Sequence, residues 1–327
     1  MAKPNLSKKT TINKKVLISI LYHDKNCDLL NLFNKLYLSK NFDFLIILDG
    51  LNTIKNQKII LKKFKRIRIY KVKKKNNSLP KNRNLSIKLL KKKHFILLFL
   101  DSDVSPVKNL IKNHLKFHIQ NKDISVVGGA VIPSFKIKIK SLWEILDGCM
   151  SWFTSIYYGK NRIVKFPYHL PTCNMSIKTE LFKQKILFDE TLKTGEDPNF
   201  CDDVRNLGKK IALISGADVI HKDRIKLKDF LNHQLIWGEH QYYTLYKKKF
   251  CTKKNKPLFY LSFLIFFPFL MPIVNTIYSF LILVPWVKKN LIFLLIFPFV
   301  IIVYLLKGIV SYKEFFKDCK KELLKLF

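Results

Sequence analysis

The feature that most constrains the fold of this chain is a pair of long apolar runs near its C-terminal end. Residues 258–287 carry no formal charge, and after a short polar turn the sixteen residues 291–306 are uncharged as well. A bilayer core about 30 Å thick needs roughly 20 apolar residues in helical form. The runs therefore predict two transmembrane helices, about 258–284 and 289–307. A buried pair of core helices is the alternative, although so long an uncharged stretch would need a much larger soluble shell.

The segments on either side of these runs are amphipathic. Residues 226–257 are rich in His, Gln, Trp and Tyr, and we expect them to form a linker helix that leads into the first run. Residues 307–327 place lysines among apolar side chains, which indicates a basic tail helix at the membrane interface. Lys289 and Lys307 would lie at the two ends of the second helix and snorkel toward the headgroups.

The formal charge of +37 at pH 7 is distributed unevenly along the chain. Residues 1–257 carry 52 basic and 20 acidic side chains, whereas residues 258–327 carry 8 and 3. Basic segments next to membrane helices tend to stay on the cytoplasmic side, where anionic lipid attracts them. We therefore expect the chain in the cytoplasmic (inner) membrane, with its large N-terminal part facing the cytoplasm and anionic lipid as a partner.

The same charge could indicate a nucleic-acid partner, but the type of base argues against one. Only six of the 60 basic residues are arginine, and the 54 lysines are spread along the whole chain. Arginine is the preferred side chain for bidentate recognition of phosphates and bases. A content of 48% hydrophobic and 13% aromatic residues also excludes a mainly disordered basic chain. We expect no nucleic-acid partner.

The cysteines and the N-terminal residues bear on the compartment. The six cysteines lie more than twenty positions apart and form no Cys-x-x-Cys pair, so a zinc knuckle is not expected. The apolar run that follows the basic tail 1–14 is only seven residues long, and we expect no secretory signal. These features suit a reducing cytosol.

Strands and helices are predicted to alternate in the N-terminal part. Short apolar runs at 16–22, 44–48 and 95–100 and an alternating segment at 67–72 are predicted to be strands. Segments between them have apolar residues at helical spacing. Near-continuous apolar strands that alternate with helices are typical of a mostly parallel sheet covered on both faces. The fold class is therefore α/β, with one α/β domain over residues 15–225. Ligands of such sheets bind at the carboxyl ends of the strands.

Acidic residues stand at those strand ends. Asp49, Asp101 and Asp103 are the only carboxylates between residues 44 and 107, and each follows an apolar strand. Two carboxylates one residue apart repel each other unless a cation lies between them. A hard divalent ion such as Mg²⁺ or Mn²⁺ takes oxygen ligands and completes its shell with substrate phosphates. A solvated turn is the plain alternative for an isolated Asp-x-Asp, but the strand context favours the metal site.

A second acidic cluster lies at Glu196 and Asp197. Phe200, Val204 and Leu207 form one apolar helical stripe after it, and a glycine ends the predicted helix. Asp197 before a proline could be the N-cap of this helix. A carboxylate at a cleft edge could instead take a proton from an attacking hydroxyl.

Together these blocks resemble a family 2 inverting glycosyltransferase. The resemblance rests on Asp49-Gly50 after a strand and on the blocks 81–104, 170–182 and 195–213, and it covers roughly residues 14–225. It implies the A-type glycosyltransferase fold, with C-terminal transmembrane helices added here. It also implies a nucleotide-sugar donor, Mg²⁺ or Mn²⁺ as cofactor, and transfer with inversion of the anomeric centre.

The resemblance also implies roles for individual residues of the donor site. Asp49 would contact the base or ribose of the nucleotide, and Arg83 would lie near the diphosphate. Asp101 would face the ribose or the water shell of the metal, and Asp103 would ligate the metal. Asn174, in the block 170–182, is counted with the nucleotide-sugar-binding residues.

Three further residues are implicated at the reaction centre. Asp197 would be the base that deprotonates the acceptor hydroxyl, with Glu196 positioning acceptor or donor. The metal would neutralise the departing diphosphate, so that no general acid is needed. His221, after the last predicted strand, could be a further metal ligand, or a buried histidine with a structural role.

Some positions depart from the family pattern. The first strand ends in Leu21-Tyr22-His23-Asp24 where the family has a Pro-x-Tyr-Asn turn, which leaves the nucleotide-base contacts there open. The processive synthases carry Gln-x-x-Arg-Trp, whereas here Gln234 is followed by Trp237 without the arginine. We therefore expect transfer of a single sugar. The aromatic helix at 141–158 could pack in the core or lie on the membrane near the acceptor.

The function that follows is a membrane-anchored transferase of one sugar to a glycan hydroxyl or lipid-linked acceptor, in cell-envelope glycan biosynthesis. A polyprenyl phosphate as acceptor is a narrower alternative. A non-catalytic basic protein that binds membranes or nucleic acid is a remote one, because it leaves the placement of Asp101, Asp103 and Asp197 unexplained.

Overall fold

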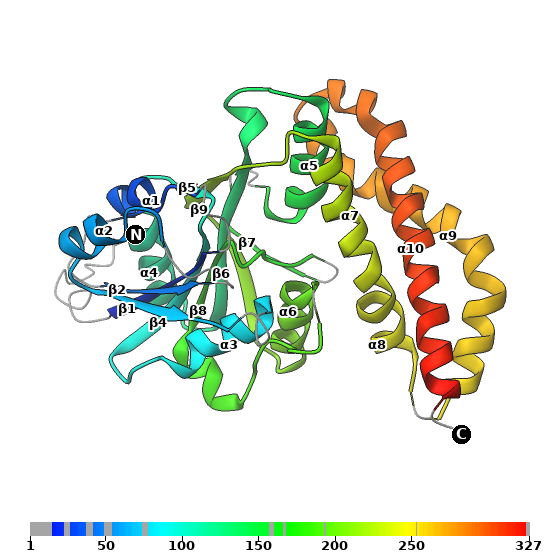
Figure 1. Ribbon diagram of the computed structural model, residues 1–327, viewed down its shortest axis with the longest axis horizontal. Coiled ribbons are helices and arrows are strands. Elements are labelled where there is room, and N and C mark those ends of the chain that lie inside the picture. The colour runs from blue at the N-terminus through cyan, green and yellow to red at the C-terminus, as the bar shows by residue number, and fades with distance from the viewer. Residues whose placement is uncertain are drawn as a thin grey trace, which may run out of the picture. The chain divides into compact units, whose positions relative to one another are not determined.

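The computed structural model describes most of the chain (Figure 1). The described residues are 15–22, 27–36, 42–48, 54–73, 78–156, 160–165, 168–192, 194–252 and 254–324. The chain divides into two compact units. The first comprises Met1–Ile132, Tyr157–Thr191 and Glu196–His221, and the second Pro133–Ile156, Leu192–Gly195 and Lys222–Phe327.

The first unit is built on a mixed sheet in which the N-terminal strands are parallel. These strands are β1 (Lys15–Tyr22), β2 (Phe42–Leu48), β3 (Ile67–Lys71) and β4 (His94–Asp101). They pair in the order β3-β2-β1-β4, and each pair is parallel. Their apolar runs are buried from end to end in β1 and β2, as a sheet covered on both faces requires. The α/β alternation predicted from the sequence is confirmed.

The later strands extend the sheet with antiparallel pairs. They are β5 (Val104–Pro106), β6 (Ile124–Pro133), β7 (Arg162–Ile163), β8 (Asn174–Lys178) and β9 (Lys210–His221). The order continues β4-β8-β6-β9-β5, and β7 pairs with β9. The β4–β8, β8–β6, β9–β5 and β7–β9 pairs are antiparallel. The last strand, β9, includes His221 as its final residue.

Helices cover both faces of this sheet. On one face, α3 (Leu79–Lys88) and α6 (Glu196–Asn206) share a buried cluster with Leu17 of β1 and Leu45 of β2. On the other, α1 (Leu29–Leu36) packs Phe33 edge-on against Phe44 of β2, with ring centroids 4.6 Å apart. The helices α2 (Gln57–Lys63) and α4 (Leu110–Gln120) complete the unit. Gly208, two residues after the end of α6, has a φ of 69°. This left-handed conformation is typical of a glycine that ends a helix, as predicted from the sequence.

The second unit is helical. It contains α5 (Leu142–Trp152), α7 (Leu227–Gln241), a π-helical turn (Tyr242–Lys247), α8 (Lys248–Phe250), α9 (Lys256–Val287), a 3₁₀ turn (Leu291–Ile296) and α10 (Phe297–Leu323). Figure 1 shows α9 and α10, in orange and red, running side by side with α7 along α10, and these helices are in contact. We call α9, the 3₁₀ turn and α10 the hairpin. At Gly308 of α10 the two helices approach closely, because an added Cβ would lie 2.6 Å from the side-chain amide nitrogen of Asn275.

Two helical segments, Lys256–Val287 and Leu291–Glu322, are long and apolar enough to cross a membrane by length and composition. The second is longer than predicted, because the basic tail expected at residues 307–327 continues α10 as far as Leu323. Lys307 does not snorkel at a helix end. It lies inside α10 and is 5% exposed, with its ammonium 3.3 Å from the side-chain oxygen of Gln234.

The aromatic helix predicted at 141–158 forms as α5 and packs in a core. Trp152 is buried and donates its indole N–H to Asp223 at 2.7 Å. Trp143 stacks on Phe230 of α7, with ring centroids 6.1 Å apart. Of the two alternatives for this helix, core packing is the one that the structure shows.

Candidate active site

Sheet topology brings together the acids after β4 and the histidine at the end of β9. Asp101 is the last residue of β4, Asp103 lies in the turn before β5, and Val104 of β5 pairs with His221 of β9. One ligand atom from each of Asp101, Asp103 and His221 lies within 4.8 Å of the others. The Nε2 atom of His221 is 3.5 Å from Oδ1 of Asp103. We call these three residues the strand-end cluster.

The chemistry of the strand-end cluster fits a divalent cation. Oδ1 of Asp103 is buried and accepts no hydrogen bond from the described residues. A buried carboxylate oxygen without a donor is costly, and a cation removes that cost. Carboxylate oxygens suit Mg²⁺ or Mn²⁺, and a neutral imidazole can complete such a set.

Arg83 and the acids of α6 form a second cluster in the same unit. The side chain of Arg83 is 5% exposed and forms an ion pair with Glu196, while its NH1 atom is 3.4 Å from Oδ1 of Asp197. Burial opposes the charge of Arg83, but the carboxylates of Asp197, Glu196 and Asp101 raise its pKa above the ordinary value. The guanidinium therefore stays charged. Because Asp101 contributes to this shift, the two clusters are electrostatic neighbours.

Asp197 is held by hydrogen bonds that are not those of a helix cap. Helix α6 begins at Glu196, so Asp197 lies inside its first turn. Its Oδ2 accepts from the backbone N–H of Thr172 at 2.9 Å and from the Thr172 hydroxyl at 3.1 Å. The N-cap alternative is therefore wrong, and Oδ1 remains on the side of Arg83. The Asp197 side chain is 18% exposed, against 6% for Glu196.

The pKa of Glu196 is raised above the ordinary value of a glutamate. Burial raises its pKa to about 6, the charge of Arg83 opposes that rise, and the neighbouring charge of Asp197 adds to it. Near neutral pH the carboxylate is ionised and can hold Arg83. The first unit thus combines the fixed charge of Arg83, a place for a metal, and the carboxylate of Asp197, whose buried Oδ1 accepts no hydrogen bond from the described residues.

Residues 20–184, about half of the chain, match the family described as Glycosyl transferase family 2. The chain belongs to glycosyl transferase family 2. It is a glycosyltransferase, and the family predicted from the sequence blocks is confirmed. No curated protein matches the sequence.

Solved structures show the same fold for this family 2 glycosyltransferase. The crystal structure of S. aureus TarS 1-349 is 13% identical with a TM-score of 0.50, and the match covers 94% of this chain and 92% of that one. The complex of TarS 1-349 with UDP-GlcNAc is 14% identical with a TM-score of 0.50, and the match covers 91% and 90%. A longer TarS structure is 15% identical with a TM-score of 0.44, over 75% of this chain. The chain spans about half of that longer protein, 47%.

Asn174, which the sequence analysis counted with the donor-binding residues, has a structural environment. It is fully buried, and its amide nitrogen donates to the Ala217 carbonyl at 2.8 Å. Its side-chain oxygen is 3.0 Å from Nε2 of His114 on α4. Because both ends of the amide are engaged inside the sheet and α4, we leave Asn174 out of the proposed ligand-binding set.

One predicted residue cannot be placed, and two residues near Asp197 were not predicted from the sequence. Asp49 lies outside the described residues. Thr172 was missed, although it stands within the block 170–182 that carried the resemblance. His169 was missed too: burial lowers its pKa, and the charge of nearby Asp197 opposes that shift. Neither residue has a local signal, since their relation to Asp197 is created only when α6 packs beside the segment before β8.

Proposed function

We propose that this glycosyltransferase moves a single sugar from a nucleotide-sugar donor to an acceptor nucleophile, with inversion at the anomeric carbon. The observation that carries the proposal is the strand-end cluster of Asp101, Asp103 and His221 beside the Arg83, Glu196 and Asp197 group in one unit. Such a pairing supplies sites for an anionic leaving group and for a base.

Asp103, Asp101 and His221 would hold the divalent ion, Mg²⁺ or Mn²⁺. When bound, this ion supplies positive charge for the diphosphate of the donor. Arg83 adds a second, permanent positive charge near Asp101. Together these charges would let the diphosphate depart without a proton donor, and we propose Arg83 as a contact of that diphosphate.

Asp197 would act as the base toward the acceptor hydroxyl. Thr172 fixes one carboxylate oxygen with two hydrogen bonds, so the other oxygen has a defined direction. Glu196 is buried against Arg83 and would position Arg83 and Asp197 without touching substrate. A base on the face opposite the leaving group gives inversion.

We further propose that the hairpin attaches the enzyme to the cytoplasmic (inner) membrane, with the first unit in the cytoplasm and a lipid-linked or glycan acceptor of the cell envelope. The apolar hairpin and the surplus of lysines support this location. Asp49 stays a proposed nucleotide contact on the strength of the family resemblance.

The test is a screen of nucleotide sugars by thermal stabilisation, with and without Mn²⁺. UDP-GlcNAc is the first probe, because the TarS structure with a similar fold was solved in complex with it. We expect stabilisation by at least one donor only when the metal is present. Proton NMR of the product should show an anomeric configuration opposite to that of the donor. Radiolabel that extracts with lipid and is released by mild acid would identify a polyprenyl phosphate acceptor.

Metal-independent binding of every donor that stabilises the protein would contradict the metal site. Retention of the anomeric configuration would contradict the role of Asp197.

A further inference from the structure

Both ends of the hairpin pack against segments that precede it in the chain. At its turn, the indole N–H of Trp286 donates to the backbone carbonyl of Cys149 in α5 at 3.0 Å. At its open end, Asp318 of α10 accepts hydrogen bonds from Tyr242 at 2.8 Å and from Lys247 at 2.7 Å. Tyr260 of α9 donates to the same carboxylate. The turn therefore contacts α5, and the open end contacts the π-helical turn at residues 242–247.

Helix α7 follows α10 between these two ends. Lys307 lies 3.3 Å from Gln234 of α7, and the hydroxyl of Ser311 donates to the Gly238 carbonyl at 2.8 Å. The ammonium of Lys307 also lies 5.4 Å from the ring centroid of Trp237. The one charged side chain within the apolar part of α10 thus faces α7.

These contacts are incompatible with a hairpin whose turn lies across a bilayer from its open end. A crossing would either carry α7 through the bilayer, with exposed Lys228 and Asp229, or break the contacts at Trp286 and Lys307. A charged residue at the centre of a bilayer is strongly disfavoured. Breaking the contacts would leave Lys307 facing lipid instead of α7.

One face of the hairpin is nevertheless apolar and uncovered. Along α9 the buried positions recur at helical spacing, as in Phe259, Phe263 and Phe267. These side chains pack in one cluster with Tyr242 and Phe315. The opposite face is exposed and carries no charge from Leu258 to Val287. Its exposed large side chains are Leu258, Leu261, Leu264, Ile265, Phe266, Phe269, Leu270, Ile273, Val274, Ile277, Phe280 and Leu281.

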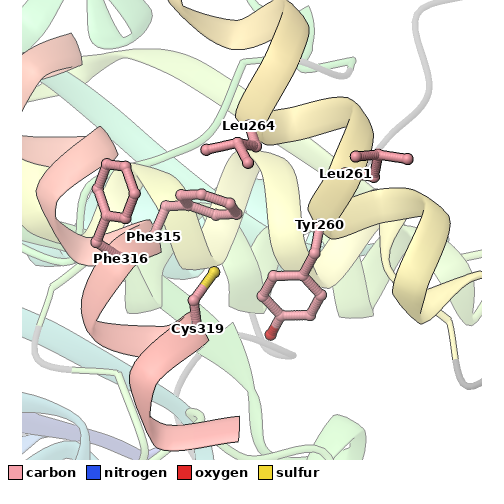
Figure 2. Close-up of a pocket in the computed structure, with 6 residues that line it drawn as sticks. All are labelled: Tyr260, Leu261, Leu264, Phe315, Phe316 and Cys319. Carbon is pink, nitrogen blue, oxygen red and sulfur yellow. The ribbon is translucent and has the colours of Figure 1, made fainter. Parts of the chain in front are cut away.

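An apolar pocket of about 330 Å³ opens on the same hairpin, between α9 and α10. Figure 2 shows Tyr260, Leu261 and Leu264 of α9 on one side and Phe315, Phe316 and Cys319 of α10 on the other. A pocket with this lining suits an aliphatic chain. It lies beside Leu261 and Leu264, so it is continuous with the exposed face of α9.

We propose that the hairpin lies along one side of the membrane, with the exposed face of α9 inserted into a single leaflet, and does not cross the bilayer. The occupant of this face is the acyl-chain region of an anionic leaflet. Exposed lysines border the face at both ends, Lys254 at the open end and Lys288 at the turn, and they match the charge of anionic headgroups. The inference rests on the proposed membrane attachment, not on the sugar transfer.

The side of the turn can be tested by labelling in cells. The full chain is expressed with Cys251 and Cys319 replaced by Ser, since the other four native cysteines are buried. A membrane-impermeant maleimide is then applied to intact spheroplasts and to inverted inner-membrane vesicles. One reporter is Lys288→Cys at the turn, and the matched control is Lys112→Cys on α4 of the first unit, since both positions are exposed.

We expect both reporters to be labelled in inverted vesicles and neither in intact spheroplasts. Labelling of Lys288→Cys from the outside of spheroplasts, with Lys112→Cys unlabelled, would overturn the proposal and establish a crossing hairpin. If the protein does not sediment with membranes at all, the attachment itself is wrong. Sugar transfer would be unaffected by either result, because the donor-binding screen needs no membrane.

A second pair of variants tests which face is inserted. Ile273→Glu, on the exposed face of α9, should lower the vesicle-bound fraction with phosphatidylcholine and phosphatidylglycerol by about tenfold or more in partition coefficient. Ile236→Glu, at a site on α7 that is 45% exposed against 59% for Ile273, should leave binding unchanged. Equal losses in the two variants would contradict insertion through α9.

Discussion

The two acidic groups of the first unit differ in how far the protein satisfies them. In the strand-end cluster, Oδ1 of Asp103 is buried without a hydrogen-bond donor among the described residues. At α6, Asp197 accepts two hydrogen bonds from Thr172, and Glu196 is paired with Arg83. Oδ1 of Asp197 also lacks a hydrogen-bond donor among the described residues, but it lies 3.4 Å from NH1 of Arg83. The buried oxygen of Asp103 faces the imidazole of His221 at 3.5 Å, whereas the α6 group includes the permanent positive charge of Arg83.

The strand-end cluster would be completed by a bound cation, whereas the side chains at α6 are already held in place by protein contacts. A buried carboxylate without a hydrogen-bond donor is stabilised when it binds a metal ion. That metal ion can then bind the diphosphate of the nucleotide sugar. A carboxylate fixed by a backbone N–H and a hydroxyl keeps its direction before substrate arrives, as a base needs. Substitutions in the two groups should therefore fail in different ways.

Removing the carboxylate of Asp103 should have the largest effect. Asp103→Ala takes away the buried oxygen of the strand-end cluster, and we expect kcat/KM to fall by about 10³-fold or more, since a catalytic metal contributes several kcal/mol. Donor binding should also lose its dependence on Mn²⁺. Asp123→Ala, which removes an exposed carboxylate paired with Lys210, is the matched control and should leave both unchanged. Full activity in Asp103→Ala would break the contrast.

Neutralising Asp197 should come next. Asp197→Asn keeps the size of the side chain but removes the base, so kcat should fall by about 10²- to 10³-fold. Metal-dependent donor binding should persist, measured by calorimetry. Asp202→Asn, one turn further along α6 in an ion pair with Arg205, serves as the control. A loss of donor affinity equal to that in Asp103→Ala would mean that the two groups are not distinct.

Protonation of Glu196 should have a smaller effect on activity than the two substitutions above. Its pKa is raised to about 6, so as the pH falls below 6 the carboxylate is protonated and the pair with Arg83 is lost. Activity should decline by about tenfold between pH 7 and pH 5, and Glu196→Gln should lack this limb at a lower plateau. The sign for stability is opposite. Because the folded-state pKa is raised, the contribution of Glu196 to stability is present below pH 4.5 and lost as the pH rises through 6.

Loss of that stability profile in Glu196→Gln, measured by thermal unfolding at pH 4.5 and pH 7, would support the assignment. An unchanged acid limb in the variant would assign the limb to another group.

The smallest effect is expected at Thr172. Thr172→Val removes the hydroxyl that donates to Asp197 at 3.1 Å but keeps the backbone N–H. The loss of one hydrogen bond to a charged group should lower kcat by about tenfold, with KM for the donor unchanged. Thr172→Ser should restore activity. Failure of the serine to rescue would mean that Thr172 acts through packing.

The strand-end cluster could be predicted from the sequence because its two aspartates form a local pattern. Asp101 and Asp103 stand directly after a buried strand in a chain where carboxylates are few, and the A-type fold brings the end of β9 to the same place. The Arg83 pair with Glu196 was not predicted, because it joins residues 113 positions apart. The hydrogen bonds of Asn174 to Ala217 and His114 could not be predicted either, because a motif gives no indication of which side-chain atoms the fold already uses.

The C-terminal part shows the same limit. Length and charge predicted two apolar helices, and they form. What the hairpin packs against could not be predicted, since the bond from Trp286 to the Cys149 carbonyl spans 137 positions and has no periodic pattern. A hydropathy pattern reports how apolar a helix is, and the neighbours of that helix decide how much of it meets lipid.

The most direct test of the account is the binding of Mn²⁺ in the presence of UDP, followed by the paramagnetic resonance signal of free Mn²⁺. We expect saturable binding of about one Mn²⁺ per chain in the wild type and in Asp197→Asn, because the strand-end cluster would hold the ion with the diphosphate. Asp103→Ala should lose this binding, and Asp123→Ala should keep it. Wild-type affinity for Mn²⁺ and UDP in Asp103→Ala would contradict the claim that the strand-end cluster is the metal site.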